Sequence, residues 1–562
     1  MFPSQGGFTR LRSLRQTSAM SDPPPSAIAP FRHADYRNLW AATVLSNFGS
    51  LVQGVGAAWM MTLLTTSPTL IALVQASSRL PYMLFALPAG TMGDLFDRRR
   101  LMIAAQSLMF VTSVVLAITA FAGGLGPWLL LSLTFLIGIG GALHNPPWQA
   151  SMGDLVPRDE LAAAVTLNSV GFNLMRGVGP AVGGMIVAAW GAAVAFGINA
   201  CTYIPLISVL IRWSGPPKRA AGHKRELFIP AVGAGLRYVA LSPNLLRIMG
   251  RGALFGFTTI GVQALLPLVA KSHPGGGSLL YGLFLGCYGV GAISGAWASP
   301  YIRARFSNEN TTRLAFAGFA VSALILALTD NTALQAVAML PGGASWVMAL
   351  SLFNATVQLS TPRWVVARVL ALYQTATFGG MATGAWAWGA VASVAGWHQA
   401  LLVCAGVLVI GIGIGRWLRI PEFGMLNLDP VNRFQEPKLA LDIRGRSGPI
   451  HVMVTYHIDA DDVPEFMRLM ARRRAARRRD GARGWALLRD MEHPELWSES
   501  YHIATWDEYV RHNLRHTTSD AEVTSALHAL NKGEGPHVHR LIERHAAPSS
   551  EDVPLMDRPN VP

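Results

Sequence analysis

The stretch Gly90-Thr91-Met92-Gly93-Asp94-Leu95-Phe96-Asp97-Arg98-Arg99-Arg100 holds two aspartates and three arginines within eleven residues. An apolar segment ends just before it, and residues 101–153 after it contain no Asp, Glu, Lys or Arg. A charged cluster between two segments that are each long enough to cross a membrane is typical of a loop at the membrane surface. The stretch therefore predicts two membrane-spanning helices joined by a short polar loop.

The composition of the chain also favours a membrane protein. Apolar residues make up 51% of the 562 residues and charged residues only 14%, against roughly 25% charged residues in soluble proteins. Segments without any Asp, Glu, Lys or Arg are residues 38–78, 101–153, 177–211, 272–302, 331–362 and 369–415. Because one spanning helix needs about 20 such residues, we expect an all-α membrane protein with many spans.

Dividing these segments at Gly/Pro-rich turns predicts twelve transmembrane helices. Their expected ranges are 38–64, 69–92, 101–122, 128–150, 162–188, 192–212, 245–270, 279–301, 313–329, 333–358, 368–391 and 398–418. Lys and Arg mark cytoplasmic loops, and Lys271 alone lies in the opposite set of loops. We therefore expect both termini in the cytoplasm, and we interpret the net charge of +14 as a topology signal, with no nucleic-acid partner.

An internal repeat at an offset of 205 residues predicts two halves of six helices each. The matching pairs are Gly90 and Gly295, Arg98 and Arg303, Arg100 and Arg305, Pro157-Arg158 and Pro362-Arg363, Gly179 and Gly384, and Gly184 and Gly389. The second copy is degenerate, because Ser299 stands where Asp94 would be.

The chain is expected to divide into seven parts. They are a disordered cytoplasmic tail (1–35), the first six-helix half (36–213), a cytoplasmic loop (214–244), the second half (245–419), a linker (420–447), a small α+β domain (448–545) and a disordered tail (546–562). In the α+β domain, alternating and amphipathic segments follow the order β-α-β-β-α-α-β, which predicts a ferredoxin-like fold.

Two arginines inside predicted spans are the strongest candidates for a substrate site. Arg79 and Arg176 lie near the middle of the second and fifth helices, where a charge facing lipid costs several kcal/mol, and no predicted span has an acidic residue in its interior. They could bind an anionic substrate, or they could hydrogen-bond helix carbonyls and amides such as Asn168 or Asn173. Further candidates for the cavity are Asn173, Gln53, Gln263 and Arg251.

The residues around the opening stretch resemble the major facilitator superfamily. Gly90, Asp94, Arg98 and Arg99 match its loop between helices 2 and 3, although Leu95 and Asp97 depart from the usual pattern, and Arg100 completes the expected latch. The resemblance implies a latch that holds the cytoplasmic side shut in the outward-open state. The motif of Gly179, Pro180, Gly183 and Gly184 resembles the helix-5 motif of exporters in this superfamily.

Longer stretches are similar to the enterobactin-exporter-like branch of the superfamily. They are Phe31–Trp40, Leu80-Pro81, Leu87–Gly90, Asp94–Arg100, Asp154–Leu161, Arg176 and Gly179-Pro180. This resemblance implies proton-driven export of siderophores, macrolides or other small molecules across the bacterial inner membrane. Asp94, Asp154 and His144 could each carry the proton. The alternative on the same fold is an importer.

The C-terminal domain is similar to antibiotic-biosynthesis-monooxygenase modules, through Trp485–Asp490, Thr505–Tyr509 and His512. Such modules usually dimerise, which implies a homodimer. The domain could be a fused enzyme or sensor that uses His502, Trp506, His512 and His516, or a docking domain with core aromatics and surface histidines, which we prefer. We expect no cofactor and no metal, since the pair His512 and His516 supplies only two ligands. The arginine-rich face of residues 468–479 could contact anionic lipid or solvent.

Overall fold

The computed structural model describes residues 28–543, with gaps at 96, 158, 216–227, 363, 423–427, 429–430, 432–433, 438, 442 and 533–534. The side chains of residues 86–87, 89–95, 162, 173 and 228–231 are also outside the described part, although their backbone is helical. The expected tail over 546–562 and most of that over 1–35 lie outside the described residues.

Long helices occupy every range in which a span is predicted from the sequence. They are α1 (Ala34–Leu64), α2 (Pro68–Leu95), α3 (Arg98–Phe121), α4 (Pro127–Leu155), α5 (Leu161–Trp190), α6 (Ala192–Arg212), α8 (Pro243–Ser272), α9 (Ser278–Arg305), α10 (Asn308–Leu328), α11 (Thr332–Leu359), α12 (Val366–Ala395) and α13 (Trp397–Ile414), with a short 3-10 helix η1 (Ala29–Arg32) before α1. Within the described residues, nine are long and apolar enough to cross a membrane, namely α3, α4, α5, α6, α8, α9, α10, α11 and α13.

One helix was not predicted from the sequence. Helix α7 (Phe228–Ala240) lies in the segment expected to be a loop. Its apolar residues alternate with Pro230, Gly233 and Gly235, which are poor helix formers. The helix packs on α12, and Gly235 lies against the Arg368 side chain. Tertiary contact therefore outweighs weak local propensity here.

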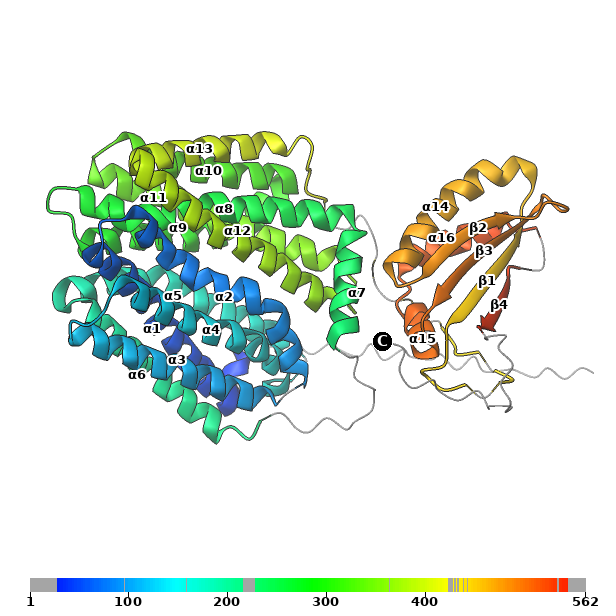
Figure 1. Ribbon diagram of the computed structural model, residues 1–562, viewed down its shortest axis with the longest axis horizontal. Helices are drawn as coiled ribbons and strands as arrows, with labels where there is room; N and C mark the ends of the chain where they lie inside the picture. Colours follow the sequence, from blue (N-terminus) through cyan, green and yellow to red (C-terminus); the bar gives the residue numbers. More distant parts are fainter. Residues whose placement is uncertain are drawn as a thin grey trace, which may run out of the picture.

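The helices form two groups in space. Figure 1 shows α1 to α6 gathered on one side and α8 to α13 on the other, with α7 across the end that faces the C-terminal domain. We call this the α7 end and the other the far end. At the far end the groups touch: the Lys271 ammonium donates to the Thr62 carbonyl, and Trp59 stacks on Tyr281 with ring centroids 6.5 Å apart.

Paired glycines bring the two groups together along α5 and α9. A Cβ atom on Gly184 would overlap the backbone of Gly282, and Gly177 and Gly289 are in equally close contact. Small residues at such crossings let helix backbones approach closely. Toward the α7 end the same two helices expose their side chains: Val170 of α5 is 56% exposed and Trp297 of α9 is 73% exposed. Between α5 and α9, the contact thus lies toward the far end, while side chains toward the α7 end are exposed.

The C-terminal domain is a four-stranded antiparallel sheet with helices packed on it. Its elements are β1 (Ile450–His457), η2 (Ala460–Asp462), α14 (Val463–Arg479), β2 (Arg483–Arg489), β3 (Leu496–Ile503), α15 (Trp506–Leu514), α16 (Thr518–Leu530) and β4 (His537–Ile542). The strand order is β2-β3-β1-β4, and the element order is the one predicted. Alternate residues of β1 are buried against α14, with Tyr456 meeting Phe466.

The glycine crossing yields a stability prediction. Gly184→Ala should destabilise the protein, because the new methyl group meets the Gly282 backbone, which cannot rotate away; overpacking of this kind costs about 1–3 kcal/mol. Gly250→Ala is the matched control: nothing lies within 4 Å of a Cβ at that helical position, and Ala gains about 0.5–1 kcal/mol there. Thermal unfolding of the purified chain measures both. Equal unfolding temperatures for the two variants would contradict the crossing.

Candidate functional site

Arg79 of α2 and Arg176 of α5 lie close together inside the bundle. The two guanidiniums are near enough to repel each other electrostatically. Arg176 hydrogen-bonds the hydroxyl of Tyr288 on α9 and lies over the ring of Trp346 on α11, with its Cζ 5.1 Å from the ring centroid. The two arginines thus come from one helix group, and the aromatic residues come from the other.

Gln263 joins the same cluster. Its Nε2 donates to the Tyr288 hydroxyl over 2.9 Å. That hydroxyl therefore links α8 and α9 to Arg176. We call Arg79, Arg176, Gln263, Tyr288 and Trp346 the arginine cluster.

The local sequence explains why this cluster forms. Arg176 directly precedes Gly177, and Tyr288 directly precedes Gly289. Because these glycines are in close contact, α5 and α9 cross where the two polar side chains leave their helices. Gly343 of α11 lies just as close to the backbone of Tyr288, which brings Trp346, one turn further along α11, to the arginine.

The positive charge of the cluster has no acidic partner within the described part of the chain. The groups that interact with Arg79 are Arg176 and the phenols of Tyr82 and Tyr288, and its Nε is buried without a hydrogen-bond acceptor. A buried cation without a counter-ion is costly. An anion placed between the two guanidiniums would offset that cost, since charge-assisted bonds from arginine to an oxyanion are strong.

The remaining predicted cavity residues lie elsewhere or outside the described part. Gln53 of α1 is buried, and its Nε2 has no described partner. The side chain of Asn173 is outside the described residues. Arg251 does not join the arginine cluster. It is fully buried beside Glu309, 3.5 Å from the carboxylate, and donates to the Gly411 carbonyl. This pairing accounts for its charge without a substrate.

The arginines of the opening stretch tie α3 to its neighbours. Arg98 donates to Asp154 of α4 over 2.9 Å, and Arg99 donates to the Leu210 carbonyl of α6 over 2.8 Å. Asp97 caps α3 by accepting from the Arg99 backbone amide over 2.9 Å, which stabilises the helix N-terminus. Arg100 is exposed. Gly90 and the Asp94 side chain lie outside the described part, so their role stays a prediction.

The helix-5 motif packs α5 on two sides. Gly179 and Gly183 face α1, where Cβ atoms would meet Leu51 at 2.9 Å and the Val52 Cα at 3.1 Å. Gly184 faces Gly282 of α9. Pro180 is buried within the helix. The motif therefore sets how closely the helix that carries Arg176 approaches both helix groups.

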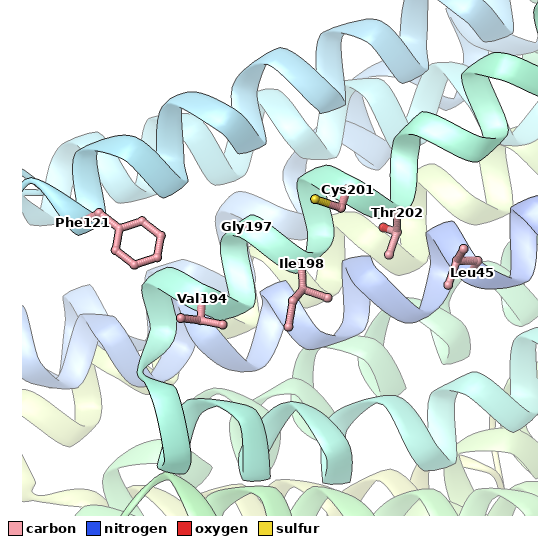
Figure 2. A pocket seen from close by; sticks show the side chains of 7 residues that line it. All are labelled: Leu45, Phe121, Val194, Gly197, Ile198, Cys201 and Thr202. Atoms are coloured by element: carbon pink, nitrogen blue, oxygen red, sulfur yellow. The ribbon is translucent and has the colours of Figure 1, made fainter.

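A separate groove lies on the outer surface of the first helix group. It has a volume of about 430 Å³ and is lined by Leu45, Phe121, Val194, Gly197, Ile198, Cys201 and Thr202. Figure 2 shows these side chains along α6, with Phe121 at one end and Leu45 at the other. The lining is almost entirely apolar and includes none of the predicted site residues.

Comparison with known proteins assigns the chain to a family. A model of the family described as transmembrane secretion effector matches residues 25–548. The chain belongs to this family of the major facilitator superfamily.

Proteins similar to this chain include two that are named as efflux proteins. Macrolide efflux protein A of Streptococcus pyogenes is 24% identical over 270 residues, which are 45% of this chain and 66% of that protein, just under two thirds. The multidrug efflux pump Tap of Mycobacterium bovis is 21% identical over 420 residues, 70% of this chain and 96% of that protein.

The fold is that of major facilitator transporters. A solved bacterial homologue of the human lysosomal transporter Spinster, in an inward-facing and unoccupied conformation, has a TM-score of 0.54 at 14% identity, with 69% of this chain and 97% of that one covered. The relatives named here are transporters rather than enzymes.

In the C-terminal domain of this family member, His512 and His516 lie near each other beside Arg477, whereas His502 lies on the other face of the sheet. His512 is buried against Tyr501 and accepts from Arg477 over 2.9 Å. Successive residues of a strand point to opposite faces, so His502 points away from His512. The His502 ring packs against that of His451 in a tilted arrangement, with ring centroids 4.2 Å apart. Burial lowers the pKa of His516 to about 4, with Arg477 adding to the effect. Trp506 donates to Glu436 over 2.7 Å.

The C-terminal domain touches the transporter part through arginines and aromatic rings. Arg515 lies over Trp364, in the turn before α12, with 4.0 Å between its Cζ and the ring centroid, and Arg479 lies over Tyr238 of α7 at 5.1 Å. The two rings meet edge to face at 5.9 Å. In Figure 1, α7 stands between the bundle and this domain. In the sequence, Arg479 belongs to a helix face expected to contact lipid or solvent. No sequence pattern indicates that Arg479 and Arg515 contact aromatic rings of the transporter part.

The buried pair of Arg251 and Glu309 predicts a large stability effect. Glu309→Gln should lower the unfolding temperature by several degrees, because it leaves Arg251 buried without a counter-ion, a change that costs about 3–5 kcal/mol. Glu465→Gln is the matched control, since its pair with Arg468 is exposed and water and salt screen such pairs. Thermal unfolding of the purified chain gives the comparison. Similar shifts in both variants would contradict the assignment.

Asp480 predicts a pH dependence of the C-terminal domain. Burial raises the pKa of its carboxyl to about 7 from an ordinary value of 3.8, although Arg479 acts in the opposite direction. Folding therefore favours the protonated form, and the stability that Asp480 contributes is present below pH 3.8 and lost as pH rises through 7. Asp480→Asn should make the domain more resistant to heat-induced proteolysis in the intact chain at pH 8.

The gain in resistance to proteolysis from Asp480→Asn should become smaller toward pH 5, where the Asp480 carboxyl of the parent protein is already protonated. His516 titrates at lower pH in both proteins and cancels in the comparison. A gain of the same size at pH 5 and pH 8 would show that ionisation of Asp480 is not the cause.

Proposed function

We propose that this chain is a secondary active exporter that moves small molecules out of the cell by alternating access and proton antiport. In this proposal twelve helices cross the bacterial inner membrane in two halves of six, with both termini in the cytoplasm. Helices α1, α2 and α12 would be the remaining three membrane spans, since at 31, 28 and 30 residues they are long enough to cross a bilayer. The efflux relatives and the charge-free segments support it.

The arginine cluster is the proposed substrate site, and the observation that carries it is the pair of half-buried arginines inside the bundle without a described carboxylate. Arg176 contacts Tyr288 and Trp346 of the other helix group. A site between the halves is where alternating access requires the substrate to bind. We infer that the substrate is a small anion with an apolar or aromatic part, a class that includes acidic siderophores and acidic antibiotics.

The helix contacts support an inward-facing state in this proposal. The two groups touch at the far end, while Val170 and Trp297 are exposed toward the α7 end, where the positive-inside rule places the cytoplasm. Gly90 and Asp94 would latch this end shut in the opposite state, with Arg98 and Arg99 holding α3 in place. The helix-5 motif would supply the surface on which α5 moves.

For the C-terminal domain we favour a docking or sensing role over catalysis. Arg515 on Trp364 and Arg479 on Tyr238 fix it to the transporter. His502 points away from His512, and His512 is buried against Arg477 and Tyr501. The contact reaches α7, which packs on α12, so docking could influence the movement of the second half. A homodimer through this domain remains part of the proposal.

The proposed function can be tested by removing the positive charges of the arginine cluster and measuring transport. In inside-out vesicles, Arg176→Gln and Arg79→Gln should each reduce uptake of an anionic substrate roughly tenfold to a hundredfold, since a hydrogen bond to a charged group contributes about 1.5–3 kcal/mol. Transport of a neutral analogue should fall much less. Arg303→Gln, at the α7 end of α9, is the control and should leave both unchanged.

Two outcomes would refute parts of this proposal. Equal loss of anionic and neutral transport would remove the anion site, and accumulation in cells rather than in inside-out vesicles would favour the importer. Uptake that persists after the pH gradient is collapsed would remove proton antiport. Asp94→Asn should impair transport while the protein still inserts into the membrane, if the latch acts as proposed.

A further inference from the structure

A basic cavity lies on the outer side of the second helix group at the α7 end. It has a volume of about 550 Å³ and is lined by Arg313, Ile412, Gly413, Arg416 and Arg419. Arg313 is in the second turn of α10, while the other residues lie at the end of α13 and just beyond it. This cavity is distinct from the arginine cluster, which is formed by α2, α5, α8, α9 and α11.

The cavity carries more positive than negative charge. Arg313 binds Glu309 through its Nε over 3.1 Å, but the same carboxylate also pairs with buried Arg251 and accepts from the Ile420 amide. Arg416 and Arg419 are exposed, and within the described residues neither has an ion pair. Glu309 therefore cannot balance the three arginines that line the cavity.

The surroundings place the cavity at a membrane surface. Val409 and Ile410, one turn before it on α13, are 57% and 62% exposed, as expected of lipid-facing residues. Trp417, between Arg416 and Arg419, is 78% exposed. Tryptophan and arginine side by side after an apolar helix are typical of the headgroup level. A ligand here would have polar groups in the cavity and apolar groups along α13.

We propose that this cavity binds the phosphate-bearing headgroup of an anionic phospholipid. The planar guanidinium matches phosphate oxygens in geometry and charge, and basic pockets between helices on the cytoplasmic side suit such headgroups. The acyl chains would run along Val409 and Ile410. Bound phosphate would also share Arg313 with Glu309, which connects the lipid to the buried network that joins α8, α10 and α13.

Native mass spectrometry of the detergent-purified full chain tests the proposal. The probes are dioleoyl phosphatidylglycerol, dioleoyl phosphatidylcholine and inorganic phosphate. Each arginine near an anionic headgroup contributes about fivefold to binding. Binding of phosphatidylglycerol to Arg416→Gln/Arg419→Gln should therefore be roughly 30-fold weaker than to the parent. Arg303→Gln/Arg305→Gln, which removes the same charge from the end of α9, should weaken binding clearly less, because it leaves the cavity intact.

The three probes distinguish a lipid site from a plain phosphate site and from unspecific binding of detergent-like molecules. Preference for phosphatidylglycerol over phosphatidylcholine, lost only in Arg416→Gln/Arg419→Gln, supports the site. Equal binding of both lipids, equal loss in both double variants, or displacement of the lipid by equimolar inorganic phosphate would overturn it. The single variants Arg416→Gln and Arg419→Gln, each expected to weaken binding about fivefold, keep the test valid if the double variant unfolds.

Discussion

The close approach of α5 and α9 is the constraint on which the rest of the molecule depends. Glycines at 177, 184, 282 and 289 remove the side chains that would hold these helices apart. The same crossing sets the distance between the helix groups, fixes the end at which they touch, and places Arg176 beside Tyr288. Packing and the candidate site are therefore two results of one contact.

This arrangement explains how a buried cation can be tolerated in an apolar bundle. Arg176 has the Tyr288 hydroxyl and the Trp346 ring, which together replace part of its hydration. Arg79 is less well satisfied, since its Nε has no described acceptor. Arg251 shows the contrasting case: its charge is met by Glu309, so it contributes to stability and leaves nothing for a substrate. Among these three arginines, a described carboxylate partner distinguishes the structural pair from the candidate binding site.

The sequence predicts some of these features and not others, for physical reasons. Helix positions follow from segments without charge, because an uncharged segment of that length has few other stable environments. Arg79 and Arg176 stand out for the same reason. Tyr288 and Trp346 do not, since aromatic residues are common in apolar helices and only the crossing of α5, α9 and α11 selects these two. Glu309 lies 58 residues from Arg251, and no spacing rule connects them. The contact of Arg515 with Trp364 likewise depends on how two parts of the chain meet.

Whether the two guanidiniums form a site for an anion can be decided by equilibrium binding to the purified protein. A radiolabelled aromatic carboxylate and its uncharged amide, matched in shape, would be titrated against the parent chain and against Arg79→Gln/Arg176→Gln. We expect the carboxylate to bind the parent at least roughly tenfold more tightly than the amide, and we expect this preference to disappear in the variant. Equal affinity of the parent for both compounds, or a preference that survives in the variant, would contradict an anion site at the arginine cluster.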